Sequence, residues 1–281
     1  MRPTRTIHAK TAALLLCTAL MTGCGGGSTP PATQSLQTEG ATQNGSQQNS
    51  DKQNQTDNDS LREALSGVKT RGPAKDVTSS KDALFVAEGD KGVEIIKIGY
   101  KDRIDHEVLS TITGINATFV TLSADKTRLY VQNREGFVNI YNISDIHHPV
   151  RERTVTAESL RLDPVSRDGR YRFVAEKEKG LCVYDISNPA TPQRIAQYSQ
   201  RPVYAVVLLD DDTRALTATK TDGVDLLDIT DPASIKKIGH HPIAGETLGL
   251  SVNASKGLLF VARGDAGVKL YDLKIFLAQS R

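Results

Sequence analysis

The chain has 281 residues, of which 38% are hydrophobic and 24% are charged, with 35 basic and 33 acidic side chains and a formal net charge of +2. This length is compatible with one or two domains. The near balance of charge argues against nucleic acid as a partner, because nucleic-acid-binding domains concentrate basic residues. Aromatic residues make up 5% of the chain and tryptophan is absent, which leaves few platforms on which a sugar ring could stack.

Residues 1–23 have the organisation of a bacterial secretion signal. Three basic residues precede the apolar run 11–21, which is too short to span a bilayer stably. The sequence Leu-Met-Thr-Gly-Cys at residues 20–24 resembles the bacterial lipobox. The resemblance implies a lipoprotein signal peptide over residues 1–23 and lipidation of Cys24, and no small residue precedes the competing Cys17. The alternative is a plain secretory signal with Cys24 incidental.

Lipidation at Cys24 would make the membrane a partner through a lipid anchor. Such lipidation attaches several acyl chains, palmitate among them, and two or more chains anchor a protein stably. The next residue is Gly25 rather than the aspartate that retains lipoproteins at the inner membrane of diderm bacteria. The resemblance therefore implies the outer membrane, with the protein facing the periplasm or the cell surface. With Cys17 removed and Cys24 acylated, Cys182 is left alone and no intramolecular disulfide is expected.

Residues 24–60 combine the lipidated Cys24 with a polar stretch rich in Gly, Ser, Gln and Asn. Almost no large apolar residues occur there, so the segment cannot bury enough surface to offset the entropy of ordering. We expect a disordered tether that holds the following domain away from the lipid headgroups.

Residues 61–281 contain an internal repeat. Five segments superpose, and their closing apolar residues recur every 43 to 45 positions. The five segments are 84–98, 129–143, 172–186, 215–229 and 259–273. Within each segment two β-rich runs flank a polar turn that contains a glycine, which is typical of a hairpin.

A further short strand precedes each hairpin, and a fourth strand follows it, as at residues 193–198. Four antiparallel strands per period of about 44 residues predict the blade of a β-propeller. Helical repeats of this length would show an apolar period of 3.6, whereas these runs alternate. The predicted fold is all-β: a propeller of about five four-stranded blades, preceded by a signal peptide and a disordered linker.

The third strands of the repeats, such as Leu181–Asp185 and Val268–Asp272, resemble those of the LVIVD-repeat family of bacterial and archaeal surface propellers. The resemblance covers roughly residues 77–273. The blades that continue into Asp-Ile-Ser-Asn-Pro (185–189) and Asp-Ile-Thr-Asp-Pro (228–232) match best, and the first blade departs at Lys97. The resemblance implies the fold and a surface location but no defined reaction.

The last repeat stops after its third strand, so its outer strand must come from elsewhere. We expect residues near 63–70 to supply it, because an open sheet edge is a liability. The tail at residues 274–278 is the alternative. Deleting residues 61–70 should then lower the melting temperature sharply, and deleting residues 275–281 should have little effect.

Two histidine pairs, His147-His148 and His240-His241, suggest metal ligands at first sight. The first pair follows a third strand and the second lies at the exit of a fourth strand. In a blade these positions lie on opposite faces, so a shared site is not expected. We predict neither a metal nor another cofactor.

Other motifs have structural explanations. Asp185, Asp228 and Asp272 recur at one repeat position, where hydrogen bonds within Asx turns explain them. Cys182 stands in a polar repeat column with no recurring histidine beside it, so we do not expect a nucleophile. The tripeptide Arg-Gly-Asp at residues 263–265 coincides with the hairpin turn of the fifth repeat, and turn chemistry accounts for it.

The hairpin turns and the connections between blades should share one face, hereafter the connection face. Its polar residues are Glu88, Asp90, Arg134, Glu135, Glu158, Glu176, Lys177, Arg201, Asp222, Glu246 and Asp265. Propellers tend to bind ligands on this face and at the mouth of the central channel. The leading hypothesis is a non-enzymatic binding or scaffold module that presents these loops to a protein or glycan partner.

The alternative is a hydrolase that acts on a polysaccharide. Its best catalytic carboxylates are Glu158 and Glu246, both on inter-blade connections. An inverting mechanism would need them about 6.5 to 9.5 Å apart. We expect that they do not converge, and that at least one is solvated or paired with a base such as Arg201.

Overall fold

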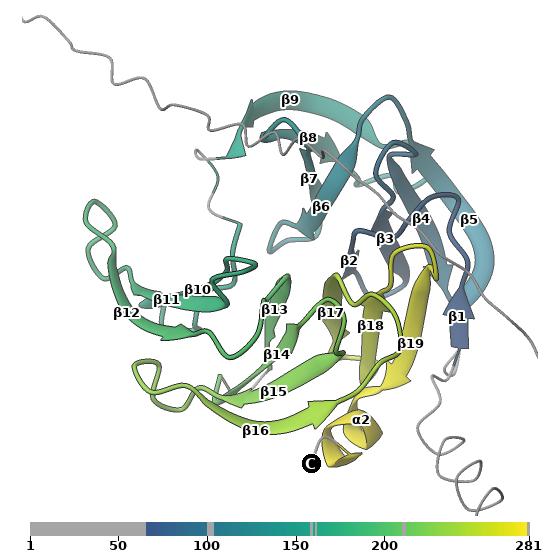
Figure 1. Cartoon of the computed structure of the whole chain (residues 1–281). Coiled ribbons are helices and arrows are strands. Elements are labelled where there is room, and N and C mark those ends of the chain that lie inside the picture. Colours follow the sequence, from purple (N-terminus) through teal and green to yellow (C-terminus); the bar gives the residue numbers. More distant parts are fainter. Residues whose placement is uncertain (1–65, 100–103, 158–159, 161, 210–211, 280–281) are drawn as a thin grey trace, which may run out of the picture. The chain divides into compact units, whose positions relative to one another are not determined.

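The computed structural model describes residues 66–99, 104–157, 160, 162–209 and 212–279. Five antiparallel sheets are arranged in a ring, which confirms the predicted all-β propeller (Figure 1). Blade 1 consists, from the axis outward, of β2 (Asp76–Ser79), β3 (Ala83–Ala87), β4 (Val93–Ile98) and β5 (Ile104–Ile112). Blade 2 consists, in the same order, of β6 (Ala117–Leu122), β7 (Arg128–Asn133), β8 (Phe137–Asn142) and β9 (Val150–Thr156).

The remaining blades follow the same order, except that blade 3 has three strands and blade 5 takes its outermost strand from the N-terminal end of the described chain. Blade 3 has β10 (Tyr171–Ala175), β11 (Leu181–Asp185) and β12 (Gln193–Tyr198), and blade 4 has β13 (Ala205–Leu208), β14 (Arg214–Ala218), β15 (Val224–Asp228) and β16 (Lys236–His241). Blade 5 has β17 (Gly249–Asn253), β18 (Leu258–Ala262), β19 (Val268–Asp272) and, outermost, β1 (Ser66–Val68).

Blade 3 has three ladder-forming strands, because its innermost segment makes only a single bridge between Val165 and Arg172. Pro164 has no N–H to donate, and the residue before a proline is restricted. The Pro164 carbonyl still accepts the Phe173 N–H at 2.9 Å. The segment therefore lies at the inner position of the blade without forming a regular strand.

The ring is closed by the N-terminal strand. β1 pairs with β19 in antiparallel register, with Ser66 opposite Leu270 and Val68 opposite Val268. The expectation that residues near 63–70 supply the outer strand of blade 5 is thus confirmed for the described part of that segment.

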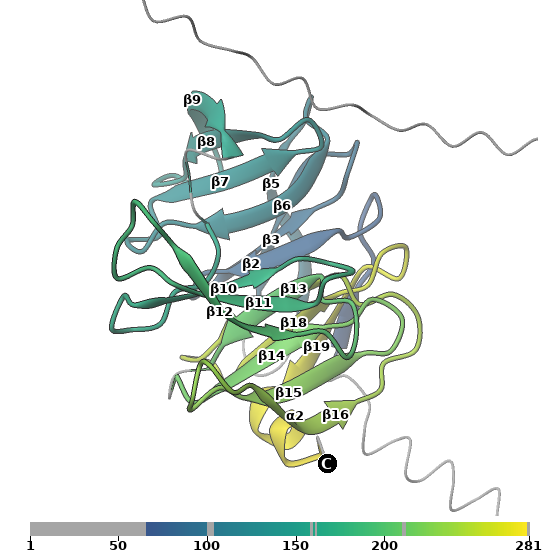
Figure 2. The same cartoon turned by 60° about the vertical axis from the view of Figure 1, so that its left-hand side comes forward.

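The C-terminal tail forms the helix α2 (Leu273–Gln279), which lies against blades 4 and 5 (Figure 2). Phe276 is 1% exposed and stacks on His241 with ring centroids 4.1 Å apart. The burial of Phe276 in an apolar cluster argues against the expectation that deleting residues 275–281 has little effect, which stays a prediction for a melting measurement. Within the described part of the chain there is no helix with both the length and the apolar character needed to cross a bilayer.

The hairpin glycines have a steric explanation. Gly92, Gly180 and Gly223 have φ values of 84°, 85° and 95°. A Cβ at these positions would collide with the backbone carbonyl of Ile112, Tyr198 and His241 respectively, where the outer strand of each blade ends. Only glycine combines this left-handed backbone with such a close approach.

Buried apolar side chains gather between neighbouring blades. Separate clusters join blade 5 to blade 1, blade 1 to blade 2, blade 3 to blade 4 and blade 4 to blade 5. Among the described residues no such cluster joins blade 2 to blade 3, and Figure 1 shows these two blades farther apart than the other neighbouring pairs. The described residues thus show four apolar clusters between blades, and Val138 and Ile140 of β8, at most 1% exposed, are buried outside them.

Candidate binding site

A pocket of about 940 Å³ lies at the centre of the ring. It is enclosed by the inner strands β2, β6, β13 and β17 and by residues 162–165 of blade 3. The segment that replaces the inner strand of blade 3 is thus part of its wall. This volume lies within the range of about 300 to 1,000 Å³ that is common for ligand pockets.

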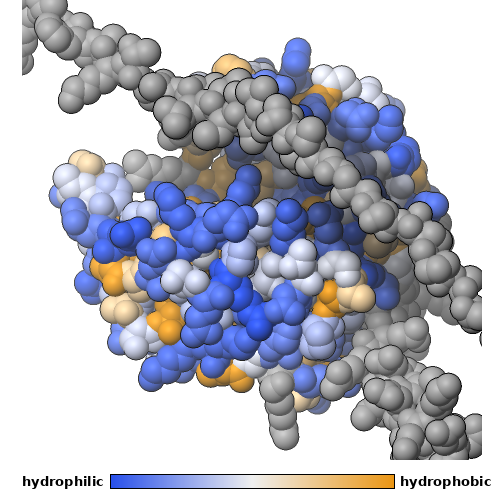
Figure 3. All heavy atoms as spheres, in the orientation of Figure 1, coloured by the Kyte–Doolittle hydropathy of each residue, from blue (hydrophilic) through white to orange (hydrophobic). Residues whose placement is uncertain are grey.

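Polar and apolar side chains share the lining of the pocket, and charged side chains lie toward its two ends. The partly exposed apolar residues of the lining include Phe119, Leu162 and Val165. Lys75, Asp76, Asp163 and Lys177 lie toward the connection face, and Lys126, Arg167 and Asp212 lie at turns on the opposite face. The outer surface seen in the same view as Figure 1 is mainly hydrophilic, with apolar residues in small separate groups (Figure 3).

Asp76 is the most deeply buried charged side chain of the pocket wall. Its Oδ2 accepts the backbone N–H of Val120 at 3.0 Å, which links β2 to the inner strand of blade 2. On the other side it lies against Gly249, where a Cβ would collide with the Asp76 carboxyl. Burial raises the pKa of this carboxyl to about 7, and the backbone N–H bonds oppose that rise. Asp76 therefore connects three inner strands and changes charge near neutral pH.

Asp163 is a second carboxyl in the pocket wall, directly before Pro164. Burial raises the pKa of Asp163, while the positive charge of Arg172 lowers it. At the opposite face, Asp212 accepts the backbone N–H of Arg167 at 2.7 Å, which joins the turns of blades 3 and 4. The acidic groups of the pocket are thus either shifted toward the neutral form or already hydrogen-bonded.

Sequence reasoning missed Asp76, although the repeat itself contained a signal. The ladder places Asp76, Ala205 and Gly249 opposite Ala87, Ala218 and Ala262, at one position of their inner strands. A carboxyl among small residues is therefore the exception in this column. The short inner strands have to be aligned before this exception becomes visible.

The structure tests only some of the site residues that the sequence predicts. Cys24 and Glu158 lie outside the described residues, as do the signal segment and the tether. Glu246 is exposed on the connection between β16 and β17, beside Gly264. The distance between the Glu158 and Glu246 carboxyls, and with it the expectation that they do not converge, stays untested.

The two histidine pairs lie in separate parts of the fold. His148 Nδ1 is 2.9 Å from Asp145 Oδ2 on the loop after β8, whereas His240 Nδ1 is 2.7 Å from Asp225 Oδ1 on blade 4. No group of three or more His, Cys, Asp or Glu side chains able to hold a metal occurs among the residues that the structure describes.

Asp225 is fully buried at the centre of a polar cluster on blade 4. Its Oδ2 accepts the Tyr198 hydroxyl at 3.0 Å, and Lys237 Nζ lies 3.4 Å from its Oδ1. Arg201 pairs with Asp222 and lies 3.7 Å from Asp225. Burial, reinforced by the Asp225 carboxylate, raises the pKa of Tyr198 above its usual range. The cluster holds β15 to its neighbours and uses the base that sequence reasoning had considered as a partner for Glu246.

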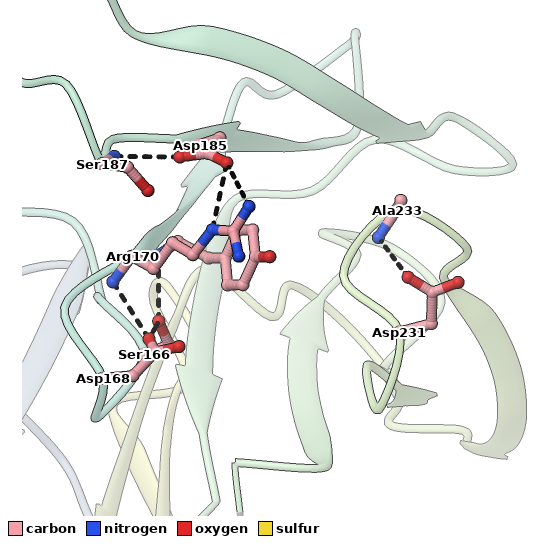
Figure 4. A network of polar contacts seen from close by, with 8 residues as sticks. Ser166, Asp168, Arg170, Asp185, Ser187, Asp231 and Ala233 are labelled. Atoms are coloured by element: carbon pink, nitrogen blue, oxygen red, sulfur yellow. Dashed lines mark hydrogen bonds and ion pairs between the residues drawn. The ribbon is translucent and has the colours of Figure 1, made fainter.

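Two of the three recurring aspartates form Asx turns, as predicted, whereas Asp272 accepts the Ile275 N–H at 2.8 Å at the start of α2. Asp185 Oδ1 accepts the Ser187 N–H at 2.9 Å, and Asp228 Oδ1 accepts the Thr230 N–H at 2.9 Å. Figure 4 shows Asp185 also bound by Arg170, whose Nη2 lies 3.0 Å from Asp185 Oδ2. These side chains shape the loops on the opposite face.

The remaining two motifs, Cys182 and the Arg-Gly-Asp segment, have structural roles in the fold. Cys182 is fully buried, and burial raises the pKa of its thiol, so it is a weak nucleophile at neutral pH. The Arg-Gly-Asp segment at residues 263–265 forms the turn between β18 and β19, where the Gly264 N–H bonds to the Ala74 carbonyl.

Fold and pocket define a five-bladed β-propeller with a central ligand-sized cavity. Residues 163–199, which span blade 3, match the family model described as the LVIVD repeat. The chain is therefore a five-bladed β-propeller that carries an LVIVD repeat. None of the curated proteins compared with the chain matches it.

Many solved structures are similar to the chain, among them two with a TM-score of 0.38. One is titled "Crystal Structure of Mitotic Checkpoint Complex", with 11% identity over 71% of this chain and 63% of that chain. The other is the Pseudomonas aeruginosa periplasmic gluconolactonase PpgL, with 13% identity over 72% of this chain and 67% of that one. The chain thus spans about two thirds of the length of each, and likeness at this level carries no argument about function.

Proposed function

We propose that this protein is a lipid-anchored, extracytoplasmic binding or scaffold module rather than an enzyme, and that its ligand enters the central pocket. The observation that carries the proposal is the pocket of about 940 Å³ enclosed by the inner strands. Of the described residues that line it, none is a histidine or a cysteine, so the wall offers no Ser-His or Cys-His pair. The partner is a protein or a glycan, or a part of one that fits this cavity.

The anchor rests on the lipobox-like residues 20–24 and the polar stretch after them. Metabolic labelling with an alkyne analogue of palmitate should tag the protein, and Cys24→Ser should abolish the tag. Cys17→Ser is the matched control, because that residue precedes the expected cleavage site. Label that persists in Cys24→Ser, or disappears in Cys17→Ser, would contradict anchoring through Cys24.

Binding in the pocket is tested by site-specific photocrosslinking in cells that produce the full chain. A benzophenone amino acid at Phe119 faces the pocket, whereas one at Val150, which is 62% exposed on β9, faces solvent on an outer strand. The proposal expects an adduct of reproducible mass from position 119 and none from position 150. Adducts from position 150 alone would move the binding surface to the outer strands.

Hydrolysis of a polysaccharide remains the alternative that the sequence suggested. Glu246 is solvent-exposed, and Glu158, the second carboxylate of that hypothesis, lies outside the described residues. Loss of a measured glycan-hydrolysing activity in Glu246→Gln, with folding unchanged, would favour the enzyme over the binding module.

A further inference from the structure

The hairpin turns contain one position where two blades have glycine and two have lysine. Gly89, Lys177, Lys220 and Gly264 occupy it, with φ values of 58°, 49°, 66° and 55°. This left-handed region is strained for residues with a Cβ, so glycine is the residue expected there.

The lysine side chain is not required for the backbone contact that this position makes. The Gly89 N–H donates to the Ala117 carbonyl at 2.9 Å, and the Lys177 N–H donates to the Val203 carbonyl at 2.8 Å. Both bonds link the turn to the next blade, with or without a side chain. Lys177 also has no ion-pair partner among the described residues, and it lines the central pocket.

A second lysine that lines the pocket, at its opposite end, also has a left-handed backbone at a turn position where another blade has glycine. Lys126 has a φ of 60° at the turn position where blade 3 has Gly169, with a φ of 75°. Lys126 lines the pocket as well. Strained backbone of this kind concentrates at functional sites, because a function offsets the strain. The chain therefore tolerates two strained turns that bring lysines to the two ends of one cavity.

The charges of the pocket wall favour a negative ligand. Four basic side chains line it, namely Lys75, Lys126, Arg167 and Lys177, against three acidic ones. Two of the acids, Asp76 and Asp163, have pKa values raised by burial, and Asp212 accepts a backbone N–H. Basic side chains thus lie at both ends of the wall and outnumber the acidic ones by one.

We propose that the central pocket binds a small organic anion with an apolar body, whose acidic group lies at Lys177. The inference rests on the proposed function, because it names the ligand class of the same pocket. Phe119, Leu162 and Val165 give the wall an apolar portion against which such a body can pack, and the acidic group can belong to a free ligand or to the part of a partner that enters the cavity. Each end of the cavity offers a lysine to the acidic group.

Two fluorescent probes test the ligand class on the full chain. 1-Anilinonaphthalene-8-sulfonate is an anion with an apolar body, and N-phenyl-1-naphthylamine has the same rings without the sulfonate. We expect saturable binding of both, with the anion at least about tenfold tighter because a lysine lies at each end of the pocket.

Lysine-to-glycine variants locate the charge. Lys177→Gly should weaken the anionic probe about three- to tenfold and leave the neutral probe unchanged. Lys220→Gly is the matched control, because it removes one lysine from the same turn position outside the pocket lining. Neither variant should lower the melting temperature, since glycine occupies this position in blades 1 and 5.

Three outcomes would overturn the inference. Equal affinity for the two probes would mean that the pocket binds neutral apolar ligands, which leaves the proposed binding function standing. An equal loss in Lys177→Gly and Lys220→Gly would assign the effect to general surface charge. Failure of both probes to saturate would reject an anion with an apolar body as the ligand class, and the photocrosslink at position 119 would then decide the proposed function separately.

Discussion

Single residues that differ from their repeat column carry most of what is specific to this propeller. Arg172 stands where the other blades have Leu84, Leu129, Ala215 and Leu259, as the strand pairing shows. Asp76 likewise stands in a column of small residues. A buried carboxyl costs free energy when it is charged, so the chain retains Asp76 at the expense of stability near neutral pH.

This cost gives Asp76 a defined effect on stability. Its pKa is about 7 in the folded chain, against 3.8 for an ordinary aspartate in water. Protonated Asp76 is therefore favoured by folding, and the free energy of unfolding should fall as pH rises from about 4 to 7, by an amount on the order of a few kcal/mol. Asp76→Asn retains an acceptor for the Val120 N–H but does not titrate.

Urea unfolding at pH 4.5 and pH 8 measures the effect. The difference in unfolding free energy, variant minus wild type, should increase between the two pH values, because only the wild type loses stability through this group. Thr78→Val, a neighbour on β2, is the control and should show a constant difference. A constant difference for Asp76→Asn would mean that the carboxyl is charged throughout.

At the scale of elements, the two chain ends protect blade 5 in different ways. β1 supplies backbone hydrogen bonds to the free edge of β19. α2 supplies no strand and instead places Phe276 against His241 and Tyr271, with ring centroids 4.1 and 5.3 Å away. Edge pairing and apolar burial are thus divided between the two ends.

Phe276→Ala should therefore destabilise the protein, by about 3 to 5 kcal/mol if the site does not collapse. Ile275→Ala is the matched control, since Ile275 is 50% exposed on the same helix, and its effect should stay within about 1 kcal/mol. Thermal unfolding followed by circular dichroism compares the two variants. Equal shifts in melting temperature would mean that the helix is docked less firmly than Phe276 indicates.

For the whole molecule, the junctions of the ring are unequal. Blades 1, 4 and 5 each share apolar clusters with both neighbours, whereas blades 2 and 3 each share one, within the described residues. The pocket wall includes residues 162–165, next to the junction that lacks a cluster. Among the described residues, the junction without a shared apolar cluster therefore lies beside the candidate binding site.

Hydrogen exchange followed by mass spectrometry should report this asymmetry. Amides of the hairpins β7–β8 and β10–β11 should exchange faster than those of β3–β4 and β14–β15, because local opening is easier where fewer apolar contacts resist it. The compared hairpins have the same position in their blades, which removes differences due to strand order. Uniform protection around the ring would show that polar contacts hold blades 2 and 3 as firmly as the apolar clusters hold the rest.

The sequence by itself determined the repeat, the blade architecture and the origin of the closing strand. The regular return of apolar residues and turn glycines is a local signal, because each blade is built from strands that follow one another in the chain. Even the Asx turns at Asp185 and Asp228 could be predicted, since each is made by residues two positions apart.

Only the tertiary structure decided the pocket, the charges in its wall and the junction between blades 2 and 3. Asp76 becomes a buried group because Val120 and Gly249, from two other blades, enclose it. Lys126 and Lys177 line one cavity only because the ring brings two distant turns to its axis. Sequence patterns report what a residue does within its own strand, whereas desolvation and shared electrostatics depend on neighbours that closure of the ring supplies.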